Sequence, residues 1–516
     1  MMTNRLTGLL SRGVVLSLLA LLSLGAQAQT RPAARYNCLS MADDETATEA
    51  GGPKNLSPLP ARLPAINTKW DADRIYRQAV VLVSFSDMDF SMDDPQARYN
   101  RIFNEPGYNE SRGPGCVADY FREQSGGLFN LEFDIYGPVK VSTKHNSGNS
   151  SGASIFREAL QILVDSLDVD YSVYDWNGNG TVNQIIFIYA GYGGNEDGSP
   201  LSQGCIWPNT RSFSTVTHNN LKFQNFTASA ELWTRGSLCG IGTVCHEFSH
   251  SLGLPDIYPT GNSPEYSVVD EWDLMDGGNF SNNGWCPPNY SGLEKMLLGW
   301  LTPIELTEGA SISDMLPVSE GGPVYQVKKT DSEYYLLENR QWSGWDFRSP
   351  GHGLLVFHVD YHLNAWSSND VNADKNHHYY DLIHADNRSY VDWDEFLDLG
   401  PEDSPYLEHH NQYLSLSPYP YVVDGAVVNN ELTDQSTPAA QVYAGDGGLM
   451  SKPITNISES ADGLISFDFM GGYLSTIENS PQTDARRQPA AAYDLQGRPA
   501  VGNGVVIQDG KKHIHH

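Results

Sequence analysis

The stretch GTVCHEFSHSLGLPD at residues 242–256 constrains this chain more than any other part of its sequence. It contains the pattern H-E-x-x-H, as His246, Glu247 and His250. On a helix, residues four apart project from one face, so both imidazoles can bind one metal ion, while Glu247 can reach a water on that metal. Gly253 permits a sharp turn, which lets Asp256 return as a third ligand. The stretch therefore predicts a metal site with a general base beside it.

A methionine downstream supports this prediction. Met275 stands in EWDLMDGG, and in zinc peptidases with an extended H-E-x-x-H pattern a tight turn carrying a methionine lies beneath the metal. Asp256 would replace the usual third histidine, which zinc tolerates because it accepts carboxylate oxygen. In another class of zinc peptidases the third ligand is a glutamate farther downstream, so Glu271 and Glu294 stay open as alternatives. The alternative, in which the stretch binds no metal, is an amphipathic core helix followed by a surface loop.

The first 28 residues have the features of an export signal. Arg5 and Arg12 supply the basic start, residues 14–24 the apolar run, and residues 26–28 (Ala-Gln-Ala) the small-residue cleavage site. The run is short for a membrane span. We therefore expect an exported, extracellular protein, with or without attachment to the cell surface. Residues 29–75, rich in Pro, Ala and small polar residues, are expected to be a pro-segment or a loosely packed lead-in.

The net charge limits the classes of binding partner, and the cysteine count indicates disulfide bonding. A formal net charge of −31 disfavours nucleic acid and anionic membranes, and it suits calcium binding and solubility outside the cell. The partners that the metal site predicts are protein or peptide substrates. An even number of cysteines in an exported chain favours disulfides, although the sequence does not choose among the pairings. Cys38 has a further interpretation, as a thiolate that caps zinc in a latent precursor. The six cysteines are Cys38, Cys116, Cys205, Cys239, Cys245 and Cys286.

Residues 76–300 have the pattern of an α/β (α+β) catalytic domain. Apolar runs of strand length alternate there with helical patterns. The expected strands cover residues 78–85, 128–136 and 184–190, and the expected helices residues 94–103, 117–123 and 151–167.

Residues 301–472 alternate short strand-like runs with Gly, Pro, Asp and Asn turns, which predicts an all-β, sandwich-like domain. The histidines of this region lack helical metal spacing, and we assign them to strand ends and aromatic packing. The acidic run at residues 392–403 suits a solvated loop better than a calcium site. Residues 473–516 predict a linker and a small β unit, for which we hypothesise a role in secretion or attachment.

A second metal site is suggested between the helix at 151–167 and the strand at 184–190. Asp175, Asn177, Asn179 and Thr181 place oxygen-bearing side chains at alternate positions, with a glycine at position six, as in a calcium loop. The bidentate glutamate expected at position twelve is replaced by Ile186, which excludes a complete EF-hand. A partial calcium site and a turn rich in Asn and Gly both stay open.

The sequence resembles the immune inhibitor A family of secreted bacterial zinc metallopeptidases over roughly residues 76–470. The resemblance is carried by GIGTVCHEFSHSLGLPDIY, CVADYFREQSG, DWNGNGTVNQIIFIYAGYG, SAEL, WDLMDGG, LGW, LLENRQWSGWD and PGHGLLVFHVDY. It implies a metzincin-like peptidase with zinc on His246, His250 and Asp256 and with Glu247 as the base.

Phe280 departs from the family pattern, because related peptidases can place an oxyanion-holding tyrosine there. Tyr258, Tyr266 and Tyr290 are the alternatives for that role. The sequence thus favours a secreted zinc endopeptidase. The competing hypothesis is a catalytically silent zinc- or calcium-binding adhesion protein, whose β domain binds glycans or proteins. The sequence does not indicate which peptide bond would be cut or where a pro-segment would be removed.

Overall fold

The computed structural model describes residues 70–110, 112–182, 184–195, 202–233, 236–260, 268–388, 414–445 and 447–472, together with backbone strands at 476–478, 493–494, 504–508 and 511–515. The expected export signal, Cys38, Tyr266 and the acidic run at 392–403 lie outside these residues. Within them, no helix combines the length and the apolar character that crossing a bilayer requires.

The N-terminal part is built on a seven-stranded sheet with the order β2-β1-β4-β6-β3, in which β5 and β7 also pair with β6. Neighbours along this order are parallel, whereas β5 and β7 run antiparallel to β6. The strands are β1 (Ile75–Ser84), β2 (Asn130–Lys140), β3 (Thr181–Val182), β4 (Ile185–Tyr192), β5 (Asn209–His218), β6 (Leu221–Trp233) and β7 (Ser237–Leu238). The continuous apolar runs of β1 and β4 are buried on both faces, as in a parallel sheet covered by helices.

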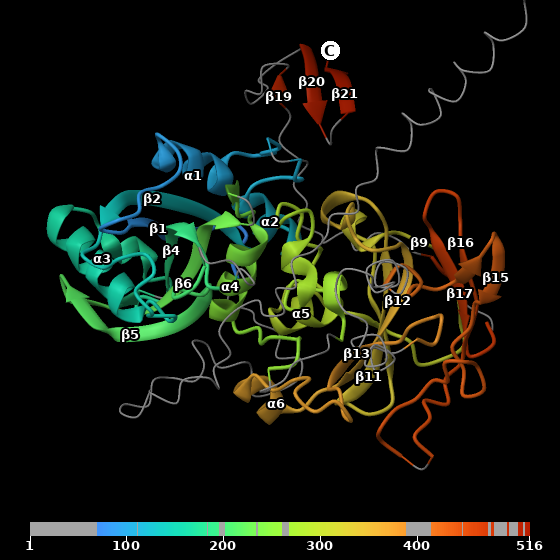
Figure 1. Ribbon diagram of the computed structural model, residues 1–516. Helices are drawn as coiled ribbons and strands as arrows, with labels where there is room; N and C mark the ends of the chain where they lie inside the picture. The colour runs from blue at the N-terminus through green and yellow to red at the C-terminus, as the bar shows by residue number, and fades with distance from the viewer. Residues whose placement is uncertain are drawn as a thin grey trace, which may run out of the picture.

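Helices cover both faces of this sheet (Figure 1). The helices α1 (Pro95–Asn104), α2 (Val117–Gln124) and α4 (Gly242–Leu252) share one core cluster with Val80 and Leu82 of β1. The helix α3 (Ala153–Ser166) shares a second core cluster with Val81 and Val83, on the opposite face. The strands and helices predicted from the apolar spacing are thereby confirmed, and the H-E-x-x-H helix is α4.

The downstream part contains two further sheets, a five-stranded sheet with the order β13-β12-β11-β10-β8 and a four-stranded sheet with the order β16-β17-β9-β18. Their strands are β8 (Ile304–Glu305), β9 (Ala310–Met315), β10 (Tyr325–Lys328), β11 (Glu333–Arg340), β12 (Gly353–Asp360), β13 (Tyr380–Leu382), β16 (Ile454–Glu459), β17 (Ile465–Phe469) and β18 (Thr476–Glu478). Between them lie the helix α6 (Leu363–Ser368) and the hairpin of β14 (Tyr421–Val423) and β15 (Ala426–Asn429).

The five-stranded sheet buries both of its faces. Tyr335 and Leu337 of β11 lie in a core cluster shared with β9 and β17 of the four-stranded sheet. Tyr334 and Leu336, on the opposite face of the same strand, lie in the cluster that contains α1, α2 and α4. One hydrophobic core therefore continues across residue 300, where the sequence predicts a domain boundary.

Buried charges also connect the two parts. Arg340 of β11 donates to Glu338 (3.1 Å) and to Asp346 (2.8 Å), and all three side chains are inaccessible to solvent. Glu338 in turn accepts a hydrogen bond from the backbone N–H of Gly292 (2.5 Å), the first residue of α5 (Gly292–Leu297). Asp346 accepts two hydrogen bonds from Asn289, at 2.9 and 2.8 Å. Buried charges are tolerated only when ion-pair and hydrogen-bond partners compensate them. The contacts of Glu338 and Asp346 with Gly292 and Asn289 therefore hold the two parts together.

The cysteines do not pair as predicted. None of the five cysteines in the described part of the chain belongs to a disulfide. Cys116 caps α2 by accepting the N–H of Asp119 (3.4 Å), Cys286 donates to the carbonyl of Trp345 (3.1 Å), and Cys245 packs inside the core. Each of these three thiols has a local packing or hydrogen-bonding role, and burial raises the pKa of all three.

The C-terminal tail forms the strands that its alternating pattern predicts. The strands β19 (Tyr493–Asp494), β20 (Gly504–Gln508) and β21 (Lys511–His515) make an antiparallel three-stranded sheet.

Candidate active site

The helix α4 and the loop after it bring three predicted metal ligands together. His246 Nε2 and His250 Nε2 each lie 3.2 Å from Asp256 Oδ1. The helix ends at Gly253, whose φ of 110° lies in the left-handed region and turns the chain back toward the histidines. The ligand atoms of the three residues lie within 4.8 Å of one another. Among the described residues, no other group of three or more His, Cys, Asp or Glu side chains converges in this way.

Backbone carbonyls orient both imidazoles. His246 Nδ1 lies 2.8 Å from the Leu274 carbonyl, and His250 Nδ1 lies 2.8 Å from the Leu254 carbonyl. A carbonyl oxygen only accepts, so both Nδ1 atoms must carry the proton when the rings are neutral, which turns the Nε2 lone pairs toward Asp256. Carbonyl groups hold metal-binding histidines in this way.

His246 Nε2, His250 Nε2 and Asp256 Oδ1 are acceptors that lie close together, and such an arrangement is stable only with a cation or a proton between them. Two lone pairs and a carboxylate oxygen at 3.2 Å repel one another unless a proton or a metal lies between them. Zinc bonds of about 2.0–2.2 Å at tetrahedral angles place ligand atoms about 3.3 Å apart, which matches both N–O distances. Without metal, burial opposes protonation of His250, but Asp256 outweighs it and raises the pKa of His250 to about 9. The donor set therefore fits zinc.

The alternative third ligands are placed differently. Glu294 is buried at the start of α5, where its carboxylate accepts from the Ser291 N–H (2.7 Å) and hydroxyl (3.1 Å) in a capping box. Glu271 does not join the ligand cluster. Asp256 is therefore the carboxylate that the fold brings to the two histidines.

Met275 lies in the segment that supports this centre. It is fully buried, and its N–H donates to Asp273 (2.7 Å). Its carbonyl accepts from Ile257 N–H (2.8 Å), the residue after Asp256, while the preceding Leu274 carbonyl orients His246. This turn thus ties a ligand on the helix to the loop that carries the third ligand.

Glu247 is buried beside the ligands with both carboxylate oxygens lacking a hydrogen-bond partner in the described structure. Its backbone carbonyl accepts hydrogen bonds from the hydroxyls of Thr210 (2.5 Å) and Thr227 (3.4 Å). Burial raises the pKa of Glu247 to about 8; His250 opposes this shift, and Asp256 adds to it. An unsatisfied buried carboxylate costs folding free energy, and raised carboxyl pKa values of this kind are typical of catalytic acids and bases.

Two of the three candidate oxyanion tyrosines can be placed. The Tyr258 ring is buried and nearly parallel to the His246 ring, with centroids 6.4 Å apart. The Tyr290 hydroxyl instead bonds to the Ser249 hydroxyl on the buried side of α4. Of these two, Tyr258 is the one whose ring lies against a ligand of the cluster.

Asn369, which belongs to no recognised sequence motif, contacts the third ligand. Its side chain bonds to both the N–H and the carboxylate of Asp256, each at 2.7 Å. The two residues are 113 positions apart and no motif surrounds Asn369, so local sequence patterns carry no signal for this contact.

The suggested calcium loop folds as a tight turn. Asp175 accepts the N–H groups of Asn179 (3.2 Å) and Gly180 (2.7 Å), and Asn179 accepts that of Thr181 (2.9 Å). These bonds are expected of an Asn- and Gly-rich turn. Calcium binding by Asp175, Asn177, Asn179 and Thr181 therefore stays a prediction.

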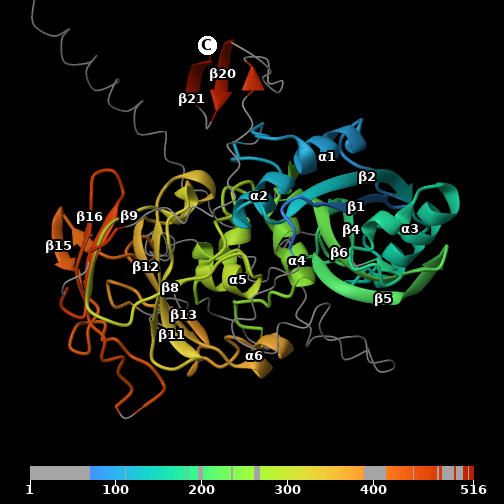
Figure 2. The same cartoon turned by 180° about the vertical axis from the view of Figure 1, so that it is seen from behind.

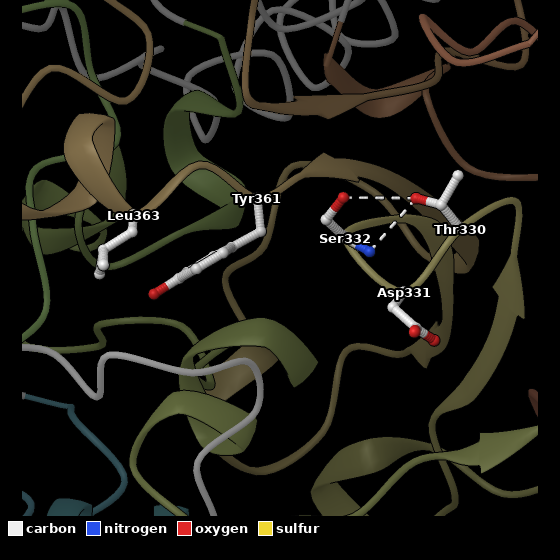
Figure 3. Close-up of a pocket in the computed structure, with 5 residues that line it drawn as sticks. All are labelled: Thr330, Asp331, Ser332, Tyr361 and Leu363. Atoms are coloured by element: carbon white, nitrogen blue, oxygen red, sulfur yellow. Dashed lines mark hydrogen bonds between the residues drawn. The ribbon is translucent and has the colours of Figure 1, made fainter.

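A separate cavity of about 530 Å³ lies in the downstream part and is largely open to solvent (Figure 3). Its lining residues are Thr330, Asp331, Ser332, Tyr361 and Leu363. The polar groups of Thr330 and Ser332 bond to each other across the turn between β10 and β11, at 3.2 and 3.3 Å. None of the converging metal ligands contributes to this cavity.

The site lies inside a region that matches a known family. Residues 68–298 match the family described as immune inhibitor A peptidase M6, catalytic domain. This part of the chain is similar to the catalytic domain of the immune inhibitor A peptidases. The resemblance predicted from the motifs is thereby confirmed over residues 68–298, which match a metallopeptidase catalytic domain.

Curated relatives agree with this assignment. The chain is 25% identical over 287 residues to immune inhibitor A of Bacillus thuringiensis subsp. alesti, a match that covers 46% of this chain and 41% of the relative. It is 22% identical over 262 residues to the pre-pro-metalloprotease PrtV of Vibrio cholerae serotype O1, covering 44% of this chain and 28% of the relative. The chain thus spans less than half the length of these relatives.

Proposed function

We propose that this protein is a zinc-dependent endopeptidase that hydrolyses peptide bonds of proteins outside the cell. One observation carries the proposal: the two Nε2 lone pairs and a carboxylate oxygen converge beside a buried carboxylate without a partner. A structural zinc site, as an adhesion protein would need, is usually closed by four Cys or His ligands and has no use for Glu247. Three protein ligands leave one position for a reactant.

Each side chain has a role in the proposed mechanism. His246, His250 and Asp256 would hold the zinc, which supplies Lewis acidity and lowers the pKa of water toward about 7. Glu247 takes the proton of the attacking water and later gives it to the amine nitrogen that leaves. The low-polarity surroundings of Glu247 keep its carboxylate basic enough for this transfer. We assign Tyr258 to stabilise the developing oxyanion, because its ring lies beside His246.

Export is part of the proposal. It is supported by the signal-like pattern at residues 1–28 and by the name of the Vibrio relative, which describes a pre-pro-protein. An acidic chain of this composition also suits an extracellular setting.

Casein cleavage by the purified protein tests the activity. Cleavage should stop when a chelator removes the metal and return when zinc is added. Glu247→Gln should keep zinc and lose cleavage, whereas Glu308→Gln, which changes an exposed glutamate, should behave as the wild type. A Glu247→Gln protein that cleaves casein at the wild-type rate would refute the role of the base. A zinc-loaded wild type that cleaves neither casein nor a peptide library would favour the adhesion hypothesis.

A further inference from the structure

Asn369 lies at the C-terminal end of α6, outside the region that matches the peptidase family. From its contacts we infer that it is a positioning residue for the third metal ligand, so the working metal site extends into the downstream part of the chain. This inference rests on the proposed zinc site.

The contact between Asn369 and Asp256 has two points. Asn369 Oδ1 accepts the backbone N–H of Asp256, and Asn369 Nδ2 donates to Asp256 Oδ2, both at 2.7 Å. The donor N–H and the acceptor carboxylate leave only one orientation for the amide. Asp256 is 2% exposed, so bulk water does not take the place of this amide. With Oδ2 held, Oδ1 is left at 3.2 Å from His246 and His250, where the metal would bind.

The fold holds Asn369 in place by its backbone. Its φ is 61°, in the left-handed region that asparagine tolerates better than most residues. Its carbonyl accepts from the Thr260 hydroxyl (2.6 Å). Trp366 of α6 is almost fully buried and packs on the Tyr361 ring, with centroids 4.7 Å apart. The helix that presents Asn369 is therefore anchored in the core.

A second asparagine, Asn372, also holds the loop that carries Asp256. Asn372 Nδ2 donates to the carbonyl of Ile257 (2.9 Å), directly after Asp256, and to the carbonyl of Tyr380 in β13 (2.8 Å). The loop at residues 256–260 is thus held at three positions by residues 369–372. In Figures 1 and 2, α6 lies at the lower centre, between the seven-stranded sheet and the downstream sheets. The downstream part therefore takes part in presenting the third ligand.

Zinc affinity measures this role directly. Groups that orient metal ligands typically contribute about 10–100-fold to affinity. Asn369→Gly keeps the left-handed backbone and removes the amide. It should therefore raise the zinc dissociation constant, measured by chelator competition, by about 10–100-fold. Removing the amide also leaves the buried N–H and carboxylate of Asp256 without this partner, so the metal-free variant should unfold at a lower temperature than the wild type, and the zinc affinities are compared below that temperature. The matched control is Asn364→Ala, which alters an exposed asparagine on the same helix and should leave zinc affinity unchanged.

A second variant covers the case in which the glycine variant does not fold. Asn369→Asp keeps the size and the Oδ1 acceptor, but it replaces the donor to Asp256 by a like charge. Weaker zinc binding by this folded variant supports the inference as well. Wild-type zinc affinity in either folded variant would overturn the inference and leave the proposed function standing. A wild type that binds no zinc would overturn both.

Discussion

Replacing Glu247 by glutamine should stabilise the metal-free protein. Burial raises the pKa of Glu247 from its ordinary 4.5 to about 8 in the folded state. At pH values between these two, the unfolded carboxylate is ionised and the folded one is protonated, so folding is coupled to the uptake of a proton. Between pH 4.5 and about pH 8, each pH unit therefore lowers the free energy of unfolding by about 1.4 kcal/mol. The cost is about 3 kcal/mol at pH 7 and below about 1 kcal/mol at pH 5. Glutamine has nearly the same shape and no charge, so it avoids this cost.

The same substitution should remove turnover. General acid–base catalysis typically contributes about 10²–10⁴-fold, and zinc-loaded Glu247→Gln should lose at least that much of kcat on casein. Few structural contacts are lost, because neither carboxylate oxygen has a hydrogen bond of good geometry in the described structure and the Thr210 hydroxyl lies close enough to interact with a glutamine as well. A gain in stability together with a loss of activity is typical of a catalytic residue rather than a structural one.

Denaturant unfolding of chelator-treated protein at pH 5 and pH 7 tests the stability claim. The difference in unfolding free energy between Glu247→Gln and the wild type should grow by about 2 kcal/mol from pH 5 to pH 7. Glu308→Gln, at an exposed position, should show no such growth. A Glu247→Gln protein that is less stable than the wild type at both pH values, or a stability difference that does not depend on pH, would refute the raised pKa of Glu247.

Three further predictions follow from other contacts. Because Asp256 raises the pKa of His250 to about 9 in the metal-free site, zinc binding at pH 7 should release at least one proton, and affinity should rise about tenfold or more per pH unit toward pH 8. Calorimetry in two buffers of different ionisation enthalpy measures that release, and zinc binding without it would contradict the assigned protonation. Arg340→Ala should destabilise the protein by about 3–5 kcal/mol because it leaves buried carboxylates without their partner, whereas Arg348→Ala should change unfolding little. If a calcium site exists at Asp175, calcium should raise the unfolding temperature of the wild type but not of Asp175→Ala; an equal response of both proteins would exclude it.

Much of the fold follows from the sequence because apolar spacing reports local structure. The runs in β1 and β4 and the half-buried pattern of α3 predict those elements within a few residues of their bounds. The long strand β6 was missed, since its first half alternates weakly and only pairing with β4 and β5 defines it. The continuous core across residue 300 was also missed, because periodicity within one strand does not show what covers its second face.

The ligands of the site were predictable, but their supports were not. His246, Glu247, His250 and Asp256 lie within eleven residues of one another, so helix geometry and a glycine turn bring them together. Asn369 reaches Asp256 through tertiary structure, and asparagine at a helix end has an ordinary capping interpretation. The cysteine prediction was wrong because it used count and compartment, whereas the packing gives these thiols local roles.

Anomalous diffraction at the zinc absorption edge, from crystals of the active protein, tests most directly whether one metal centre does the chemistry. The structure predicts a single strong peak about 2.0–2.2 Å from His246 Nε2, His250 Nε2 and Asp256 Oδ1. A fully active, zinc-containing protein whose peak lies away from these three atoms would contradict the proposed function.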